Sequence, residues 1–212
     1  MSAEESPALQ RFAELLIRWN RSINLVSRGD IANLWTRHVA DSVQLARYWG
    51  DSPPARGIDL GSGAGFPGLV LAIQFGVAFD LVEQDAAKAA FLREAARVTA
   101  APVTIHATKI EAAVLPPAPL VTARALAPLS RLLGYAERLL APGGICLFLK
   151  GRGVETEITD AAPRWHMRVE RFPSATDANG MILRISELAG AGSTDAGQPD
   201  TSGSEQVRTG RR

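Results

Sequence analysis

The sequence predicts an α/β fold in which a largely parallel sheet is covered by helices on both faces. Over the first 50 residues, apolar side chains recur only at helical spacing. From residue 56 to residue 150, short apolar runs alternate with helical stretches, a pattern typical of parallel strands joined by helices. Near the C-terminus, the turn-rich stretch PSATDANG joins two strand-like runs, so these two strands should be antiparallel to each other.

The first 50 residues are predicted to form a helical cap. One amphipathic helix is indicated before a break at residues 27–30, and another after it. The apolar positions are Leu9, Phe12, Leu15, Leu16 and Trp19 in the first helix, and Ile31, Leu34, Trp35, Val39 and Val43 in the second. Pro53 and Pro54 then interrupt the chain, which places the end of the cap near residue 50.

Residues 51–188 are predicted to form the sheet-containing domain. Five strands are expected at residues 56–60, 78–83, 103–107, 120–123 and 145–150, with helices starting near Pro67, Ala86, Pro128 and Val154. The antiparallel pair is expected at residues 165–172 and 181–188. Residues 189–212 contain no aromatic residue and little else to bury, so a disordered tail is expected there.

The composition is that of a globular chain outside the membrane. Of its 212 residues, 46% are hydrophobic and 21% charged, and no apolar run approaches the roughly 20 residues of a membrane span. Its N-terminus, MSAEESPALQRF, has no basic region followed by an apolar one, so a cytoplasmic location is expected. The single cysteine, Cys146, allows neither an internal disulfide nor a thiolate metal cluster, and no metal site is expected. A net charge of +1 restricts any RNA-binding surface to a local patch, and no obligatory protein partner is evident.

Two overlapping glycine patterns occur in the stretch GIDLGSGAGFPGL, at residues 57–69. Gly63, Gly65 and Gly68 spell the G-x-G-x-x-G fingerprint of NAD-binding proteins. Read from Gly61, the same stretch is a G-x-G-x-G loop preceded by Asp59, which suits S-adenosylmethionine better. Glycine is needed where a backbone turns sharply or a ligand approaches it closely, so a cofactor loop between strand and helix is expected.

The second predicted strand ends at an acid, Glu83, 22 positions after Gly61. A carboxylate at this place can accept hydrogen bonds from both ribose hydroxyls of a nucleotide cofactor. Since NAD and S-adenosylmethionine share that ribose, Glu83 does not distinguish them. Asp59 and the antiparallel C-terminal pair favour the methyl donor. Two alternatives remain open: an NAD(P)-dependent oxidoreductase, and a non-catalytic module that binds S-adenosylmethionine and RNA.

Several short motifs in this order resemble a known family. GIDLGSGAGFPG is preceded by Trp19-Asn20 and by Arg37-His38-x-x-Asp41-Ser42, and it is followed by Thr122-Ala123-Arg124-Ala125 and Leu149-Lys150-Gly151. Together, over residues 8–188, they resemble the bacterial guanine-N7 methyltransferases of small-subunit ribosomal RNA, the glucose-inhibited division protein B family. The sequence departs from the family pattern at Pro119, where an acid is usual, and at Met181, where a basic residue is frequent.

The resemblance implies a class I seven-stranded methyltransferase fold with an N-terminal helical cap, S-adenosylmethionine as cofactor, and 16S ribosomal RNA or the assembling 30S subunit as partner. It implies that Ile110 and Glu111 flank the adenine and that Arg124 closes the site. Together with the glycine loop and Glu83, the expected cofactor-binding residues are Gly61, Ser62, Gly63, Gly65, Phe66, Glu83, Ile110, Glu111 and Arg124.

No catalytic base is expected. Guanine N7 carries an in-plane lone pair and no proton, so it can attack the methyl group directly, and the enzyme would act by alignment and electrostatics. In agreement, Arg124-Ala125-Leu126-Ala127 stands where amino-group methyltransferases carry an Asn/Asp-Pro-Pro-aromatic run. Cys146 lies in the apolar run ICLFL and is interpreted as a core residue, not a nucleophile.

The candidate RNA-contacting residues are Arg37, His38, Lys88, Lys150 and Arg152. For His38, a contact with phosphate or base competes with a half-buried position in which the ring bonds to its neighbours on the helix. The basic residues near positions 37 and 150–152 are equally consistent with solvated surface charges.

Overall fold

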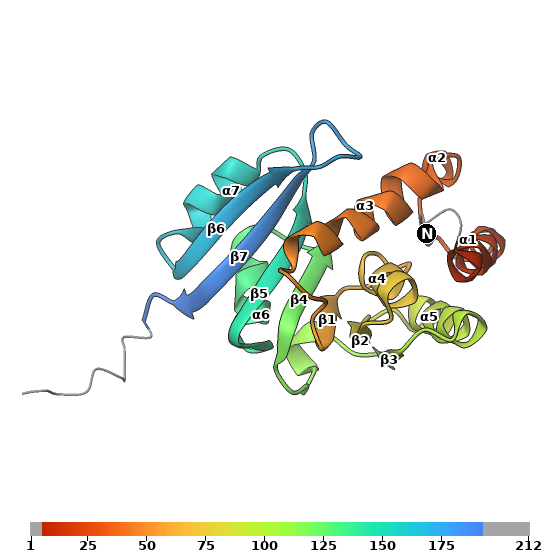
Figure 1. Cartoon of the computed structure of the whole chain (residues 1–212), viewed down its shortest axis with the longest axis horizontal. Coiled ribbons are helices and arrows are strands. Elements are labelled where there is room, and N and C mark those ends of the chain that lie inside the picture. The colour runs from red at the N-terminus through yellow and green to blue at the C-terminus, as the bar shows by residue number, and fades with distance from the viewer. Residues whose placement is uncertain (1–5, 193–212) are drawn as a thin grey trace, which may run out of the picture.

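The computed structural model describes residues 6–192 and consists of a seven-stranded sheet between two layers of helices (Figure 1). The strand order is β3-β2-β1-β4-β5-β7-β6. The strands are β1 (Arg56–Leu60), β2 (Ala78–Val82), β3 (Val103–His106), β4 (Ala118–Arg124), β5 (Leu140–Lys150), β6 (Trp165–Pro173) and β7 (Met181–Gly190).

Strand directions confirm the expected mixed sheet. β1 to β5 pair in parallel, whereas β7 is antiparallel both to β5, with Phe148 opposite Leu183, and to β6, with Val169 opposite Ile185. Parallel neighbours require crossover helices, which lie on both faces of the sheet. These helices are α4 (Gly68–Phe75), α5 (Ala86–Thr99), the short 3-10 helix η4 (Ile110–Ala112), α6 (Leu129–Glu137) and α7 (Val154–Ala161).

Alternating strand residues divide the core into two clusters, one on each face of the sheet. On β4, Leu120 faces the cluster that holds α1, α4 and α5, while Val121 faces the cluster that holds α6 and α7. On β5, Leu147 and Phe148 alternate in the same way. A sheet buried on both faces explains why its strands are continuous apolar runs in the sequence.

Within residues 6–50, the N-terminal segment has helices as its only regular elements, as predicted. They are α1 (Pro7–Trp19), α2 (Arg28–Ile31), η2 (Trp35–Ala40), α3 (Asp41–Val43) and the 3-10 helix η3 (Gln44–Tyr48). Ser6 caps α1 by accepting a hydrogen bond from the Leu9 amide. The turn η2 is a π-helix, which helical spacing alone does not indicate.

Helix α1 packs into the same core as α4 and α5. The ring of Phe12 lies 5.6 Å from that of Phe66, at the end of the glycine loop, and 6.2 Å from that of Phe91 on α5. Trp19 meets Phe91 edge to face at 5.7 Å, consistent with a core role for this tryptophan. The division of the chain into a cap of residues 1–50 and a domain of residues 51–188 stays a prediction.

The last strand runs past its predicted end. β7 continues to Gly190, whose amide donates to Glu137 Oε1 at 2.7 Å, and the Ala191 amide donates to the Arg164 carbonyl. Residues 189 and 190 therefore belong to the sheet and not to the expected tail, because backbone pairing needs no side chain to bury. The rest of that expected tail, from residue 193, lies outside the described residues.

Two truncations should separate the strand from the segment beyond it. Removing residues 193–212 should leave the thermal midpoint unchanged, because their composition cannot build a core. Removing everything after Leu188 should lower the midpoint, because it deletes the end of β7 and its contacts with Glu137 and Arg164. Calorimetry of the two truncated chains beside the full chain measures this. Equal midpoints for both truncations would contradict the role given to residues 189–192.

Candidate active site

A cleft of about 500 Å³ opens at the carboxyl ends of β1, β2 and β4. Ligands of parallel sheets bind at this edge, where the loops that leave the strands converge. Eight of the nine predicted cofactor-binding residues line the cleft: Gly61, Ser62, Gly63, Phe66, Glu83, Ile110, Glu111 and Arg124. Gly65 is not among the lining residues. Its φ is +94°, and an added Cβ there would lie 2.9 Å from the Leu69 side chain.

Asp59 lies near the end of β1, directly before the glycine loop. This side chain is fully buried, accepts a hydrogen bond from Thr122 Oγ1 at 2.7 Å, and does not line the cleft. Burial raises its pKa to about 6, against the opposing effect of hydrogen bonds such as that from Thr122. A Cβ at Gly68 would lie 2.5 Å from Asp59 Cβ, so glycine at this position lets α4 start directly above the acid.

Glu83 joins the loop to the end of β2. Its Oε2 accepts from the Gly63 amide and its Oε1 from the Asp85 amide, both at 2.8 Å, and the residue is 7% exposed. Each carboxylate oxygen has more than one lone pair, so both can still accept a ribose hydroxyl. The carboxylate is thus fixed by the backbone beside the cleft, in the place that the sequence predicts.

The Glu111 side chain is held by two residues of α6 that sequence analysis did not single out. Glu111 Oε1 accepts from Tyr135 Oη at 2.5 Å and from an Arg131 guanidinium nitrogen at 3.1 Å. The hydrogen bond from Tyr135, and then that from Arg131, lowers the pKa of Glu111 to about 2. Arg131 and Tyr135 line the cleft themselves. The i, i+4 spacing of Arg131 and Tyr135 did not predict this role, because their partner Glu111 lies on another element.

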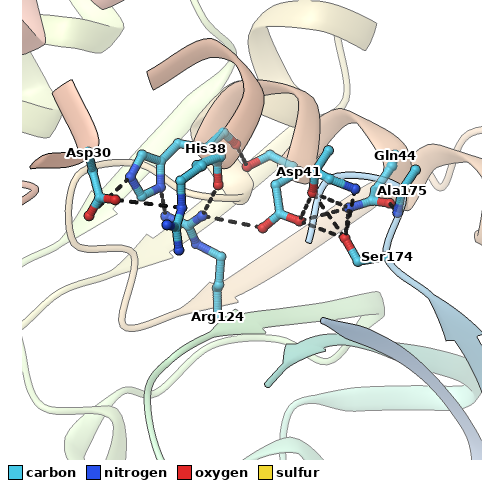
Figure 2. A network of polar contacts seen from close by, with 10 residues as sticks. Asp30, His38, Asp41, Gln44, Arg124, Ser174 and Ala175 are labelled. Atoms are coloured by element: carbon cyan, nitrogen blue, oxygen red, sulfur yellow. Dashed lines mark hydrogen bonds and ion pairs between the residues drawn. The ribbon is translucent and has the colours of Figure 1, made fainter. Parts of the chain in front are cut away.

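Arg124, at the end of β4, forms the inner wall of the cleft through what we term the arginine network (Arg124, His38, Asp41 and Phe66). Figure 2 shows its guanidinium between the His38 ring and the Asp41 carboxylate. It donates to His38 Nδ1 at 2.6 Å and to Asp41 Oδ2 at 3.4 Å, and it lies 4.9 Å from the centre of the Phe66 ring. The Arg37 carbonyl accepts a further hydrogen bond at 3.1 Å.

His38 is a neutral ring packed between neighbours. It stacks on Phe66 with ring centres 5.0 Å apart, and its pKa is lowered to about 4, first by burial and then by the charge of Arg124. Because a guanidinium only donates, Nδ1 must be the acceptor and the ring proton lies on Nε2. Of the two interpretations left open by the sequence, the geometry favours the half-buried one, with Arg124 as the partner.

Asp41 extends the arginine network to the turn between β6 and β7. Its Oδ1 accepts from Gln44 Nε2 at 2.7 Å and from two hydroxyls of that turn, Thr176 at 2.6 Å and Ser174 at 3.3 Å. Gln44 also accepts from the Ala175 amide at 2.9 Å, as the labelled residues of Figure 2 show. A turn that the sequence marks only as polar therefore packs against the N-terminal helices.

A second cleft, of about 310 Å³, adjoins the first. The two clefts share His38, Arg124 and Ala125, so the arginine network separates them. The second is bounded by the ends of β4 and β5, by α7 and by the β6–β7 turn.

The chain matches one family over most of its length. A family model described as rRNA small subunit methyltransferase G (GidB) covers residues 5–180. The chain belongs to this family. A Gluconobacter oxydans protein named ribosomal RNA small subunit methyltransferase G is 52% identical over 189 residues, or 89% of this chain and 96% of that protein. A relative of the same name from Acidiphilium cryptum is 55% identical over 183 residues, or 85% of this chain and 84% of that protein.

Solved structures show that the fold is the class I S-adenosylmethionine-dependent methyltransferase fold. The N-methyltransferase NodS from Bradyrhizobium japonicum, in complex with S-adenosyl-L-homocysteine, superposes with a TM-score of 0.56 at 15% identity, over 82% of this chain and 96% of that chain. A ribosomal protein L11 methylase from Lactobacillus delbrueckii gives a TM-score of 0.55 at 18% identity, over 69% of this chain and 76% of that chain.

The basic residues predicted to contact RNA differ in their availability. Arg37 is 58% exposed, with Asp30 3.6 Å away, and Arg152 is exposed. Lys88 is half-buried and lines the cofactor cleft. Lys150, by contrast, has a 9% exposed side chain and donates to Glu157 Oε2 at 2.6 Å and to the Ala127 carbonyl at 3.0 Å. It therefore presents no solvated surface charge in this methyltransferase G family member.

Other chemistries find no support among the described residues. Cys146 is fully buried in β5, and burial raises the pKa of its thiol, which disfavours a nucleophilic thiolate. Within residues 6–192, no group of three His, Cys, Asp or Glu side chains is placed to hold a metal ion. No helix in the same range is long and apolar enough to cross a membrane.

The environment of His38 predicts its titration. Histidine NMR signals of the native chain should show His38 titrating at about pH 4, because burial and Arg124 both disfavour the imidazolium. In Arg124→Gln the midpoint should move upward, since the guanidinium charge is removed while burial remains. A His38 midpoint at or above the unperturbed value of about 6.5 in the native chain would contradict the arginine network as described.

Proposed function

We propose that the chain transfers the methyl group of S-adenosylmethionine to N7 of a guanine in 16S ribosomal RNA. Membership of the methyltransferase G family supports this proposal. The observation that carries the choice of acceptor atom is the arginine network, because the imidazole at the junction of the two clefts is neutral and its Nδ1 is occupied by Arg124. An imidazole that is not available as a base suits an acceptor that has no proton to lose.

The first cleft fits S-adenosylmethionine. Its glycine loop offers backbone amides without side chains, and the carboxylate of Glu83 is fixed where paired ribose hydroxyls can donate to it. In this proposal Ile110 and Glu111, which also line the cleft, flank the adenine. In this proposal Phe66 and Arg124 close the cleft toward the acceptor.

The reaction requires alignment more than proton transfer. S-adenosylmethionine, when bound, would supply an electrophilic methyl group: the N7–carbon bond would form as the sulfur–carbon bond breaks, and the positive charge would pass from sulfur to the guanine ring. The chain's contribution is to hold the two partners in line and to exclude water. Phe66, Arg124 and His38 are locked against one another, so the wall between the clefts is rigid when the partners meet.

The alternative functions considered from sequence gain nothing from the structure. An NAD(P)-dependent oxidoreductase would have the parallel sheet of two repeated halves, whereas here β7 inserts antiparallel between β5 and β6. The family is one of methyltransferases, which also argues against a module that binds the cofactor without turnover.

The substrate is proposed to be the small-subunit RNA, free or within the assembling 30S subunit, in the cytoplasm where ribosomes are made. Arg37 and Arg152 lie exposed or largely exposed near the second cleft and are the proposed phosphate contacts. They position the RNA without reading its sequence, so the choice of nucleotide must rest on other groups.

Replacing Glu83 tests the cofactor site. Glu83→Ala should weaken S-adenosylmethionine binding by about 1.5 to 3 kcal/mol, the range for lost charge-assisted hydrogen bonds. Glu83→Gln, which keeps one acceptor oxygen, should lose less. Calorimetric titration gives both values, and thermal unfolding of the variants without ligand reports whether the loop still folds. An unchanged dissociation constant in a folded Glu83→Ala would remove Glu83 from the site.

The proposed reaction is tested on small subunits from a strain that lacks the gene. The purified chain and labelled S-adenosylmethionine should introduce one methyl group, and chemical cleavage at N7-methylguanine should locate it in 16S ribosomal RNA. The single-turnover rate should show no titration of a base between about pH 6 and about pH 9, because His38 titrates well below that range. Absence of methyl transfer to subunits and to free 16S RNA would refute the proposal.

Two variants separate alignment from base catalysis. Arg124→Ala should lower the single-turnover rate by about 10- to 1000-fold through lost alignment. His38→Gln, whose amide oxygen can still accept from the guanidinium, should lower the rate less than Arg124→Ala. A wild-type rate that falls with protonation of one group, together with loss of that dependence in His38→Gln, would show that the mechanism uses a base.

A further inference from the structure

The second cleft has the position that an acceptor base requires. A nucleophile must approach the methyl carbon from the side opposite to the sulfur, so the acceptor and the cofactor have to meet where two adjoining clefts join. The two clefts share only His38, Arg124 and Ala125. A base in a folded RNA reaches such a hollow by leaving its stack. With about 310 Å³, the cleft has the size of a small ligand pocket.

We propose that the second cleft receives the guanine base of the acceptor nucleotide and that Glu157, paired with Lys150, reads its Watson–Crick edge. This inference rests on the proposed function and adds to it the residue that selects the base. Glu157 lies in the first turn of α7, and both it and Lys150 line the cleft.

The pair matches the edge of guanine chemically. That edge presents two donors, N1–H and the N2 amino group, beside one acceptor, O6. Glu157 offers a carboxylate and Lys150 an ammonium, with Nζ and Oε2 2.6 Å apart. Oε2 already accepts from Lys150 and from the Leu129 amide, at 2.6 Å, whereas Oε1 has no hydrogen bond to any other residue in the range 6–192. The free oxygen can accept from guanine while the ammonium donates its third hydrogen to O6.

The other carboxylates of the second cleft are less suited to this role. Asp41 accepts from Gln44, Ser174 and Thr176 and also contacts Arg124, so its oxygens are engaged. Asp177 is exposed on the β6–β7 turn, where its Oδ1 accepts from the Asn179 amide. Glu157 is less exposed than Asp177 and is held by both Lys150 and the Leu129 amide, which gives its remaining oxygen a fixed direction.

A residue that recognises the Watson–Crick edge is needed, because N7 by itself does not distinguish guanine from adenine. Adenine carries the same in-plane lone pair at N7. Its Watson–Crick edge, however, has an acceptor at N1 where guanine has a donor, so a carboxylate that faces N1 repels adenine and binds guanine. Discrimination by such paired contacts is worth about 10- to 100-fold per base.

The test compares Glu157→Gln with Glu155→Gln on the same helix. Glutamine keeps one oxygen for Lys150 and Leu129 but replaces the free oxygen with an amino group. Glu157→Gln should lower the single-turnover rate on small subunits about 10- to 100-fold, with the S-adenosylmethionine dissociation constant within about twofold of wild type. Glu155, which is exposed and pairs with Arg171, lies outside both clefts, so Glu155→Gln should keep the wild-type rate.

A second readout changes the RNA. In subunits reconstituted with adenine at the mapped acceptor position, wild type should be about 10- to 100-fold slower than with guanine, and inosine, which keeps N1–H but lacks the amino group, should lie between them. In Glu157→Gln the ratio of guanine to adenine rates should fall, because an amide can donate to N1 of adenine. The wild-type comparison needs no variant, and equal rates on guanine and adenine would overturn the inference even if Glu157→Gln does not fold.

Several outcomes would overturn the inference. A wild-type rate for Glu157→Gln would do so, as would equal wild-type rates on guanine, inosine and adenine. Loss of cofactor binding with an unchanged guanine-to-adenine ratio would show that Glu157 only holds the loop at Ala127 and Leu129. A lower ratio of guanine to adenine rates in Asp177→Asn but not in Glu157→Gln would show that Asp177 in the β6–β7 turn recognises the base. If wild type methylates no subunit RNA at all, the proposed function itself fails, which is a separate result.

Discussion

The rest of the site depends on the hydrogen bonds that the buried guanidinium of Arg124 makes to its neighbours. The guanidinium is a charge held largely out of water, and burial lowers its pKa, an effect that Asp41 partly offsets. Such a charge is tolerated only when its donors are satisfied, and here they go to His38, Asp41 and the Arg37 carbonyl, with Phe66 beneath. Removing the Asp41 carboxylate would leave this buried charge without its ion-pair partner, at a cost of about 3 to 5 kcal/mol. The arginine network therefore constrains every element that reaches it.

Those elements come from distant parts of the chain. Arg124 ends β4, His38 and Asp41 lie on the N-terminal helices, Phe66 belongs to the glycine loop, and the β6–β7 turn joins through Ser174 and Thr176. A displacement of the turn would alter the hydrogen bonds of Asp41, and through them the position of Arg124. The Asp41 carboxylate thus connects the β6–β7 turn, which borders the second cleft, to Arg124, which lines both clefts. The π-helical turn that carries His38 places it in this network.

The same arrangement suits the methyl transfer proposed above, which uses no base. A neutral histidine whose free nitrogen lies against a guanidinium cannot take a proton from an acceptor, but it can keep the guanidinium and the Phe66 ring in place. Rigidity is then the catalytic contribution, because the geometry is already set before the partners arrive. Lys150 and Glu157 have a comparable double role, since they fix the loop after β4 while also facing the second cleft.

The sequence by itself determined the features that are local or periodic. Apolar runs that alternate with helical stretches predicted the parallel sheet, and the turn at PSATDANG predicted the antiparallel pair. The glycines and Glu83 predicted the position of the cofactor cleft. These features depend on residues that are near one another in the sequence, because local spacing decides which side chains are buried and where the backbone turns. Only the tertiary structure decided what side chains from separate elements do together. It removed Gly65 from the cleft lining, gave Lys150 a carboxylate partner, made Arg124 the partner of His38, and brought Arg131 and Tyr135 to Glu111. These outcomes depend on distances across the fold, and no spacing along the chain encodes which buried charges will meet.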